Sequence, residues 1–205
     1  AVILGHRETS LPLVEKAYRQ ADGEKKLAYA KVLGMLGDGS GLETLVAEVR
    51  QAKQWDVKPS WNIGREHPDA IRAGWEMSPL DNTLAALGRT RRPEALPAVL
   101  EKLALLRPES GMSHHRAVYM ALEWLADPRA ARPLAELLGK PGMSGHAVTS
   151  IDQRATSDNT RMTATRELAL ARTLYRCGDW QGLGEKTLRQ YSQDLRGHFA
   201  RHAQA

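Results

Sequence analysis

Leucine residues recur along the chain in pairs nine positions apart, and each pair brackets a short polar turn. The pairs are Leu36/Leu45, Leu87/Leu96, Leu125/Leu134 and Leu174/Leu183. On both sides of each turn the apolar residues keep helical spacing, which predicts amphipathic helices. Four segments built to one pattern therefore predict four helical hairpins in a repeat architecture.

The residues within these turns suit the ends and starts of helices. A glycine in the left-handed conformation is expected to end the first helix, and a proline suits the start of the second. An aspartate at the turn is expected to accept from the first amides of the second helix as its N-cap. The residues concerned are Gly37, Gly88 and Gly178, Pro93 and Pro128, and Asp127 and Asp179.

The pattern also gives boundaries along the chain. A half-repeat is expected over 1–22, with Ser10 as the N-cap of its helix, and hairpins over about 23–54, 79–107, 113–139 and 160–203. A long closing helix is expected to end the chain, because apolar residues follow an i, i+3, i+7, i+11 stripe. The stripe consists of Leu188, Tyr191, Leu195 and Phe199.

Composition supports an all-α fold. Of 205 residues, 42% are hydrophobic, which excludes disorder as the main state. Aromatic residues make up only 5%, so the core must be built mainly from aliphatic helix formers. The one cysteine, Cys177, excludes an intrachain disulfide framework, and no apolar run is long enough to span a bilayer, so no membrane partner is expected.

Insertions between the hairpins carry the candidate functional residues, because insertions between successive repeats project from one end of such an array. The first insertion, 55–78, is rich in tryptophan. The second and third echo each other as Gly-Met-Ser-His-His and Gly-Met-Ser-Gly-His, each with a histidine soon after a serine at an expected helix start. The candidate binding residues are Trp55, Trp61, Trp75, Ser113, His114, His115, Arg116, Ser144 and His146.

Two interpretations of this group are open. In one, the histidines and tryptophans converge on a polar, aromatic-rimmed binding site. In the other, Ser113 and Ser144 are N-caps and the histidines bond to neighbouring carbonyls. No metal site is expected, since adjacent residues such as His114 and His115 point about 100° apart on a helix and no His-x-x-x-His or cysteine partner accompanies them.

Motifs for catalysis are absent from the sequence. Gly37, Gly39 and Gly41 alternate too closely for a dinucleotide fingerprint, and neither a Walker loop nor a Gly-x-Ser-x-Gly elbow occurs. Cys177 is interpreted as a packing residue. The net charge of +5 is concentrated after residue 160, where acids are interleaved with the arginines, so a solvated helix face is favoured over a nucleic-acid ridge.

The turns resemble those of HEAT-like repeats, and the best match is Leu125-Ala-Asp-Pro-Arg-Ala-Ala-Arg-Pro-Leu134. In such repeats a helix ends, an Asp-Pro-Arg-type turn follows, and a second helix lines the concave side. The resemblance implies a right-handed α-solenoid of about four HEAT-like hairpins with a preceding half-repeat.

Longer stretches resemble the C-terminal helical region of a group of bacterial FAD-dependent oxidoreductases. They include Leu36-Gly-Asp-Gly-Ser-Gly41, Ser113-His-His-Arg-Ala117, Lys140-Pro-Gly-Met-Ser-Gly-His146 and Arg166-Glu-Leu-Ala-Leu-Ala171. The resemblance implies an accessory domain without catalytic residues, whose partner is an N-terminal flavin domain that holds the FAD. It further implies that the chain, which begins at Ala1 inside an apolar run, is part of a longer protein.

Three functions are open on this basis. The first is the accessory and interaction domain of such an oxidoreductase, with no cofactor of its own. The second is a freestanding HEAT-like scaffold that binds a protein through the tryptophan- and histidine-bearing loops. The third, which the charge pattern favours least, is a DNA-binding solenoid of the alkylation-repeat kind.

Overall fold

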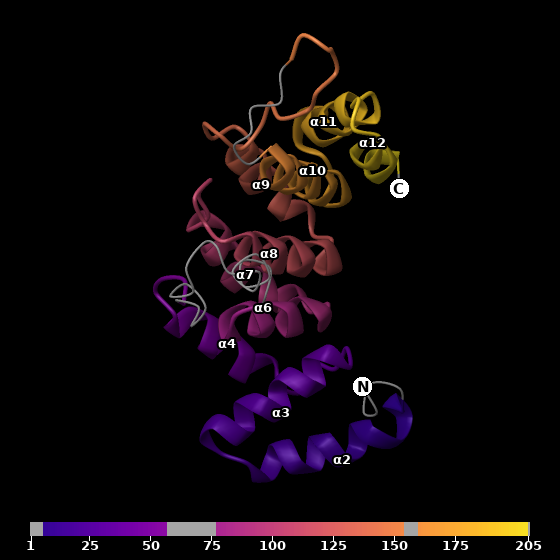
Figure 1. Ribbon diagram of the computed structural model, residues 1–205. Coiled ribbons are helices and arrows are strands. Elements are labelled where there is room, and N and C mark those ends of the chain that lie inside the picture. The colour runs from indigo at the N-terminus through magenta and orange to yellow at the C-terminus, as the bar shows by residue number, and fades with distance from the viewer. Residues whose placement is uncertain (1–5, 57–76, 154–159, 205) are drawn as a thin grey trace, which may run out of the picture.

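The computed structural model describes residues 6–56, 77–153 and 160–204, and all regular structure in these ranges is helical (Figure 1). The all-α prediction is confirmed. Short 3-10 helices precede α7, α9 and α11. The helices are α2 (Arg7–Gln20), α3 (Gly23–Met35), α4 (Leu42–Gln51), α6 (Pro79–Arg89), η2 (Pro93–Ala95), α7 (Leu96–Ala104), α8 (Met112–Leu125), η3 (Pro128–Ala130), α9 (Ala131–Leu138), α10 (Thr160–Arg176), η4 (Trp180–Gly182), α11 (Leu183–Ser192) and α12 (Gly197–Gln204).

The helices lie in two rows that follow the order of the chain. In one row α3, α6, α8 and α10 each contact the next, and in the other α4, α7 and α9 do the same. Helix α2 packs on α3 at the N-terminal end, while α11 and α12 pack on α10 at the other end (Figure 1). Each of the first three hairpins therefore adds one helix to each row, while the fourth adds α10 to the first row and packs α11 on α10.

This layering gives the molecule two different edges. The turns inside the hairpins lie together: Gly37 lies next to Arg89, and Gly178 next to Pro128. We call this edge, with turns 36–41, 88–93, 125–128 and 176–180, the turn end. The segments 52–56, 77–78, 105–111 and 139–153, which connect one hairpin to the next, make up the insertion end.

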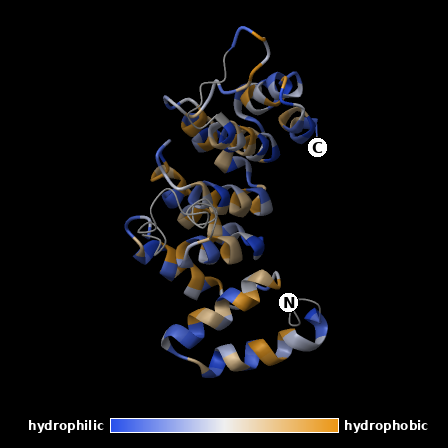
Figure 2. Cartoon of the chain, in the orientation of Figure 1, coloured by the Kyte–Doolittle hydropathy of each residue, from blue (hydrophilic) through white to orange (hydrophobic). Residues whose placement is uncertain are grey.

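The core consists of aliphatic side chains between the two rows. Leu45, Leu84, Leu122 and Leu134 are completely buried in it, and apolar and polar residues alternate around the helices (Figure 2). A smaller cluster lies between α10, α11 and α12, where Tyr191 and Phe199 meet edge to face with ring centroids 6.2 Å apart. In the part of the chain that the structure describes, no helix is both long and apolar enough to cross a membrane.

The turn chemistry agrees with the sequence in most positions. Gly37 and Gly178 have positive φ angles of 79° and 102°. Asp127 accepts from the amide of Arg129 at 2.9 Å, and Asp179 accepts from the first amides of α11. Two prolines open the 3-10 helices η2 and η3. These residues end one helix and start the next as expected.

The prediction for Gly88 is wrong. Gly88 lies inside α6, and the residue that takes the left-handed conformation in this turn is Arg91, with φ 54°. A Cβ at position 88 would overlap the backbone of Ala121 in α8 and come within 2.6 Å of its Cβ. Glycine is therefore required here for the close approach of two helices and not for a turn.

The two ends of the chain also differ from the expectation. Ser10 is not an N-cap, because α2 begins at Arg7 and the amide of Ser10 already donates within the helix, to the carbonyl of His6. The closing helix is broken between α11 and α12. There the amide of Leu195 donates to the carbonyl of Val148 at 2.8 Å, and this tertiary contact replaces the helical bond.

Candidate functional site

The candidate site lies at the insertion end, where Trp55 and His114 stack face to face. Their ring centroids are 4.5 Å apart and the planes differ by 13°. Trp55 follows α4, and His114 lies in the first turn of α8, so the stack joins the first hairpin to the third. Trp61 and Trp75, the other tryptophans of the first insertion, lie outside the described residues.

A buried carboxylate fixes the other edge of His114. The Nδ1 of His114 donates to Oδ1 of Asp81 at 2.7 Å, and the side chain of Asp81 is completely buried. Asp81 has this position because it completes a capping box at the start of α6: its Oδ2 accepts from the amide of Ser78 at 2.9 Å, and Ser78 Oγ accepts from the amide of Asp81 at 3.1 Å.

A second aspartate extends the network toward Trp55. Oδ1 of Asp56 accepts from the hydroxyl of Ser78 at 2.7 Å, and Oδ2 accepts from the amide of Leu80 at 3.1 Å. The start of α6 is thus held by two carboxylates, as its positive dipole end favours. The segment that carries Trp55 is tied to α6 by the same bonds.

The electrostatics of the Asp81–His114 pair follow from these contacts. Burial raises the pKa of Asp81, but the bonds from His114 and from the Ser78 amide outweigh it, with help from Ser113, and hold the pKa below 3.8. Asp81 is therefore an anion at neutral pH. No described residue bonds to the Nε2 of His114. The side chain of His114 is only 6% exposed, so the main effect of its bond to Asp81 is to join α6 to α8.

Ser113 is not the N-cap that the second interpretation made it, whereas His115 bonds to a neighbouring carbonyl as that interpretation expected. Ser113 is buried in the first turn of α8 and is not its N-cap, since that position belongs to Gly111. His115 points away from His114: its Nε2 donates to the carbonyl of Arg107 at 3.0 Å and its Nδ1 accepts from the hydroxyl of Tyr119 at 2.9 Å.

His115 is a buried neutral group. Desolvation, together with the nearby positive charge of Arg166, lowers its pKa to about 3. Both ring nitrogens are occupied by the contacts just described, so His115 has no nitrogen left for a ligand. The next residue, Arg116, is exposed on α8.

Ser144 and His146 lie in the irregular segment that follows α9. Ser144 is exposed and caps no helix, because the next helix, α10, begins only at Thr160. The Nε2 of His146 donates to the carbonyl of Gly142 at 3.2 Å. His146 contacts its own loop, Glu167 of α10 and Arg196, and none of these contacts joins it to His114. The structure therefore does not bring the three histidines together; His115 and His146 bond instead to carbonyls, as in the second interpretation.

Two neighbouring residues of α10, Arg166 and Glu167, join the insertions instead. Arg166 donates to the carbonyl of Gly142 at 2.7 Å and to that of Pro108, so one guanidinium holds the second and the third insertion together. Glu167 is 2% exposed and accepts from the amides of Gly145 and His146 at 2.9 and 2.8 Å. It also accepts from the hydroxyl of Tyr191.

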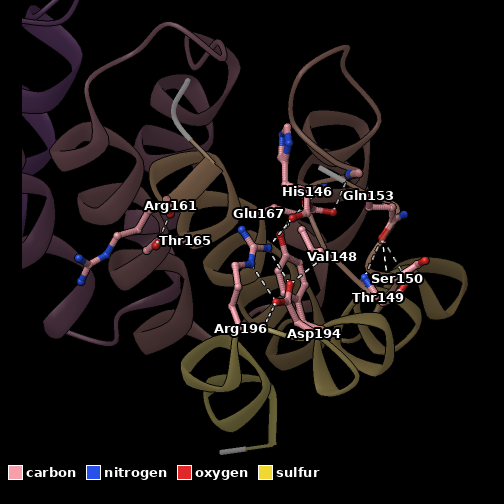
Figure 3. A network of polar contacts seen from close by, with 12 residues as sticks. His146, Val148, Thr149, Ser150, Gln153, Arg161, Thr165, Glu167, Asp194 and Arg196 are labelled. Atoms are coloured by element: carbon pink, nitrogen blue, oxygen red, sulfur yellow. Dashed lines mark hydrogen bonds and ion pairs between the residues drawn. The ribbon is translucent and has the colours of Figure 1, made fainter. Parts of the chain in front are cut away.

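Asp194 and Arg196 fix the far side of the same loop (Figure 3). Asp194 accepts from the amide of Val148 at 2.9 Å and pairs with Arg196, whose guanidinium also donates to the carbonyl of His146 at 2.7 Å. The pKa of Asp194 is lowered: burial opposes this, but the Arg196 bond and the amides prevail.

The interpretation of the C-terminal arginines as a solvated helix face needs correction for Arg166 and Arg196, whereas Arg161, Arg176, Arg189 and Arg201 are exposed as expected. Arg166 is 7% exposed, and the Arg196 side chain is 20% exposed, so neither belongs to a solvated helix face. The only sequence signal for the buried positions of Arg166 and Glu167 was that they lie between Ala164 and Leu168, on the buried side of α10.

The described residues offer neither a metal centre nor a reactive thiol. No group of three or more His, Cys, Asp or Glu side chains in these ranges is placed to hold a metal ion. Burial raises the pKa of Cys177 to about 12, and its thiol faces the carbonyl of Leu122. Gly37, Gly39 and Gly41 belong to the turn between α3 and α4, so they do not form a dinucleotide-binding loop between a strand and a helix.

Comparisons of the chain with protein-family models, with curated proteins and with solved structures gave no match. Its function is therefore argued from the geometry of the described residues.

Proposed function

We propose that the chain is an α-solenoid of HEAT-like hairpins that serves as the accessory and interaction domain of a bacterial FAD-dependent oxidoreductase, with the insertion end facing the flavin domain. In this proposal the chain contributes a binding face, and the FAD and the redox chemistry belong to the other domain. In this proposal no catalytic role is assigned to the described residues.

Two features support the repeat architecture. Hairpins stacked in chain order place each helix against the corresponding helix of the next hairpin, which is the arrangement that repeat proteins use. In addition, Gly37 and Gly178, and likewise Asp127 and Asp179, have equivalent roles in different turns.

The observation that carries the interaction role is the rigidity of the insertion end. Irregular loops normally leave their backbone groups to water. Here the segments 105–111 and 139–148 are held by the buried Arg166 and Glu167, and the segment 52–56 is held by the starts of α6 and α8. A loop face fixed before binding loses less conformational entropy when a partner docks, and this raises affinity.

One apolar side chain of this face is available to a partner. Ile151 is 88% exposed on the segment 139–153. Leu13, on the outer face of α2, is 70% exposed and provides a matched position far along the chain from the proposed face.

The test begins with the natural coding sequence, expressed whole. We expect a dinucleotide-binding region upstream of Ala1 and bound flavin, seen as absorbance near 450 nm. Hydrogen exchange of 105–111 and 139–153 is expected to be slower in the whole protein than in this chain alone, while exchange of the turn end stays the same.

Substitutions then test the face itself. Ile151→Asp is expected to weaken the association of this chain with the separately expressed flavin region at least tenfold, while Leu13→Asp leaves it unchanged. A natural protein that starts near Ala1 and binds no flavin contradicts the oxidoreductase assignment and favours the freestanding scaffold. Equal exchange rates at the insertion end with and without the upstream region contradict the proposed face.

A further inference from the structure

A pocket at the turn end is lined by three arginines and a tryptophan. It has a volume of about 370 Å³ and lies where α2 begins and where α3, α6 and α8 end. This is the edge opposite the insertion end, so the pocket is independent of the proposed partner face. Its lining residues are Arg7, Leu36, Gly37, Arg89, Arg91 and Trp124.

The lining residues are held in place by packing. The guanidinium of Arg89 lies over the ring of Trp124, 5.5 Å from its centroid. A terminal nitrogen of Arg7 lies 4.0 Å from the position that a Cβ of Gly37 would take, so the small turn residue leaves room for that guanidinium. Arg7 is also the first residue of α2, and the positive end of this helix dipole lies beside the pocket.

The three positive charges of the pocket are not balanced by acids. Within the described ranges Arg7, Arg89 and Arg91 form no ion pair, although eight other arginines do. Glu123 pairs with two arginines of α10, and Asp38 accepts from the amide of Ser40, so neither forms an ion pair with the pocket arginines. Three like charges around one hollow repel one another, and a bound anion relieves this repulsion.

The backbone of Arg91 adds a second unfavourable feature. Arg91 adopts the left-handed conformation, with φ 54°, which costs a residue with a side chain about 1 kcal/mol relative to glycine. The conformation at position 91 thus favours glycine, yet the chain carries an arginine there, and this arginine lines the pocket.

We propose that this pocket binds the phosphate groups of a small phosphorylated molecule of about the size of pyrophosphate or a nucleotide. Planar guanidinium groups bind phosphate oxygens in pairs, and three of them can surround one or two phosphates. A nucleic-acid strand needs a longer track of free charge. The arginines further along this edge, Arg129, Arg132, Arg172 and Arg176, are already paired with carboxylates.

Calorimetric titration with sodium pyrophosphate in 50 mM salt tests the proposal, with ATP and a 20-nucleotide single-stranded DNA as further probes. We expect saturable binding of pyrophosphate and competition by ATP. Arg89→Gln and Arg91→Gly are each expected to weaken binding at least tenfold. Arg91→Gly must do so without lowering the melting temperature, because glycine relieves the left-handed strain.

Arg132→Gln is the matched control, because Arg132 also lies over a tryptophan, 5.9 Å from the centroid of Trp180, but outside the pocket. Its affinity for pyrophosphate is expected to equal that of the unmodified chain. Absence of saturable binding at millimolar pyrophosphate overturns the proposal. So does an equal loss in Arg132→Gln, or tight binding of the DNA alone, since either outcome points to the general positive surface.

Discussion

Replacement of His114 by alanine tests whether the insertion end is built around the buried Asp81–His114 pair. The substitution removes the Nδ1–H donor and leaves the Asp81 carboxylate, which is completely buried, without that partner. Leaving a buried charge without its partner costs about 3 to 5 kcal/mol, and loss of the ring stack on Trp55 costs about 0.5 to 1.5 kcal/mol.

These contributions overlap, so we expect the free energy of unfolding to fall by about 4 kcal/mol. For a chain of this length that corresponds to a decrease in melting temperature of about 8 to 16 °C. Urea unfolding followed by helical circular dichroism at pH 7 measures it. The double variant Asp81→Leu/His114→Leu removes both polar partners and is expected to recover part of the loss.

A loss below about 1 kcal/mol in His114→Ala refutes this reasoning, because it means that the Asp81 carboxylate is solvated or finds another donor. In that case the Nε2 of His114, to which no described residue bonds, becomes the feature of interest, and a ligand-binding role replaces the structural one. A double variant that is less stable than His114→Ala also contradicts this reasoning, because the stability then depends on packing volume and not on the polar pair.

The remaining predictions concern pH and helix packing. The unfolded chain protonates His115 near pH 6.5 but the folded chain only near pH 3, so its contribution to stability is full above about pH 6.5 and falls by at most about 1.4 kcal/mol per pH unit as pH drops toward 3. Urea midpoints between pH 8 and 4 are expected to show this slope, and His115→Gln is expected to reduce it. Equal slopes in the unmodified chain and in His115→Gln contradict this prediction. Gly88→Ala is expected to lower the free energy of unfolding by about 3 kcal/mol or more, because its Cβ would overlap Ala121. Gly139→Ala is the control: its Cβ would meet its nearest neighbour at an ordinary distance of 3.6 Å, so its stability is expected to stay within about 1 kcal/mol of the unmodified chain. Similar melting curves for the two variants contradict the close approach of α6 and α8.

The helices and most turns were predictable because their signals are local. A helix end with Gly37 or Asp127 depends on residues only a few positions away, which the sequence displays directly. The break after α11 was not predictable in this way. Leu195 continues the apolar stripe, but its amide bonds to Val148, 47 residues earlier in the chain, and periodicity contains no information on such a contact.

The candidate site was predictable only in part. Insertions at one end of an array bring Trp55 near His114. The segment of Trp55 lies at the start of α6 and His114 at the start of α8, and these two helices are neighbours in one row. The histidines diverge for a reason that helix geometry supplies: neighbouring residues point about 100° apart, so when His114 faces Asp81, His115 must face elsewhere.

Lysine and arginine side chains at the insertion end can lie in the buried interface between layers because they donate to backbone carbonyls there. The end of a helix leaves carbonyls without donors, and the next layer supplies them: Lys102 donates to Ala52 after α4, and Lys140 donates to Leu106 after α7. Arg166 repeats the arrangement one layer later, at Gly142 after α9, and also donates to Pro108 after α7. Three of the positive charges are thus used between repeats, whereas Arg7, Arg89 and Arg91 of the turn-end pocket donate to no such carbonyl within the described ranges. This difference makes the turn end, and not the insertion end, the place to expect an anion.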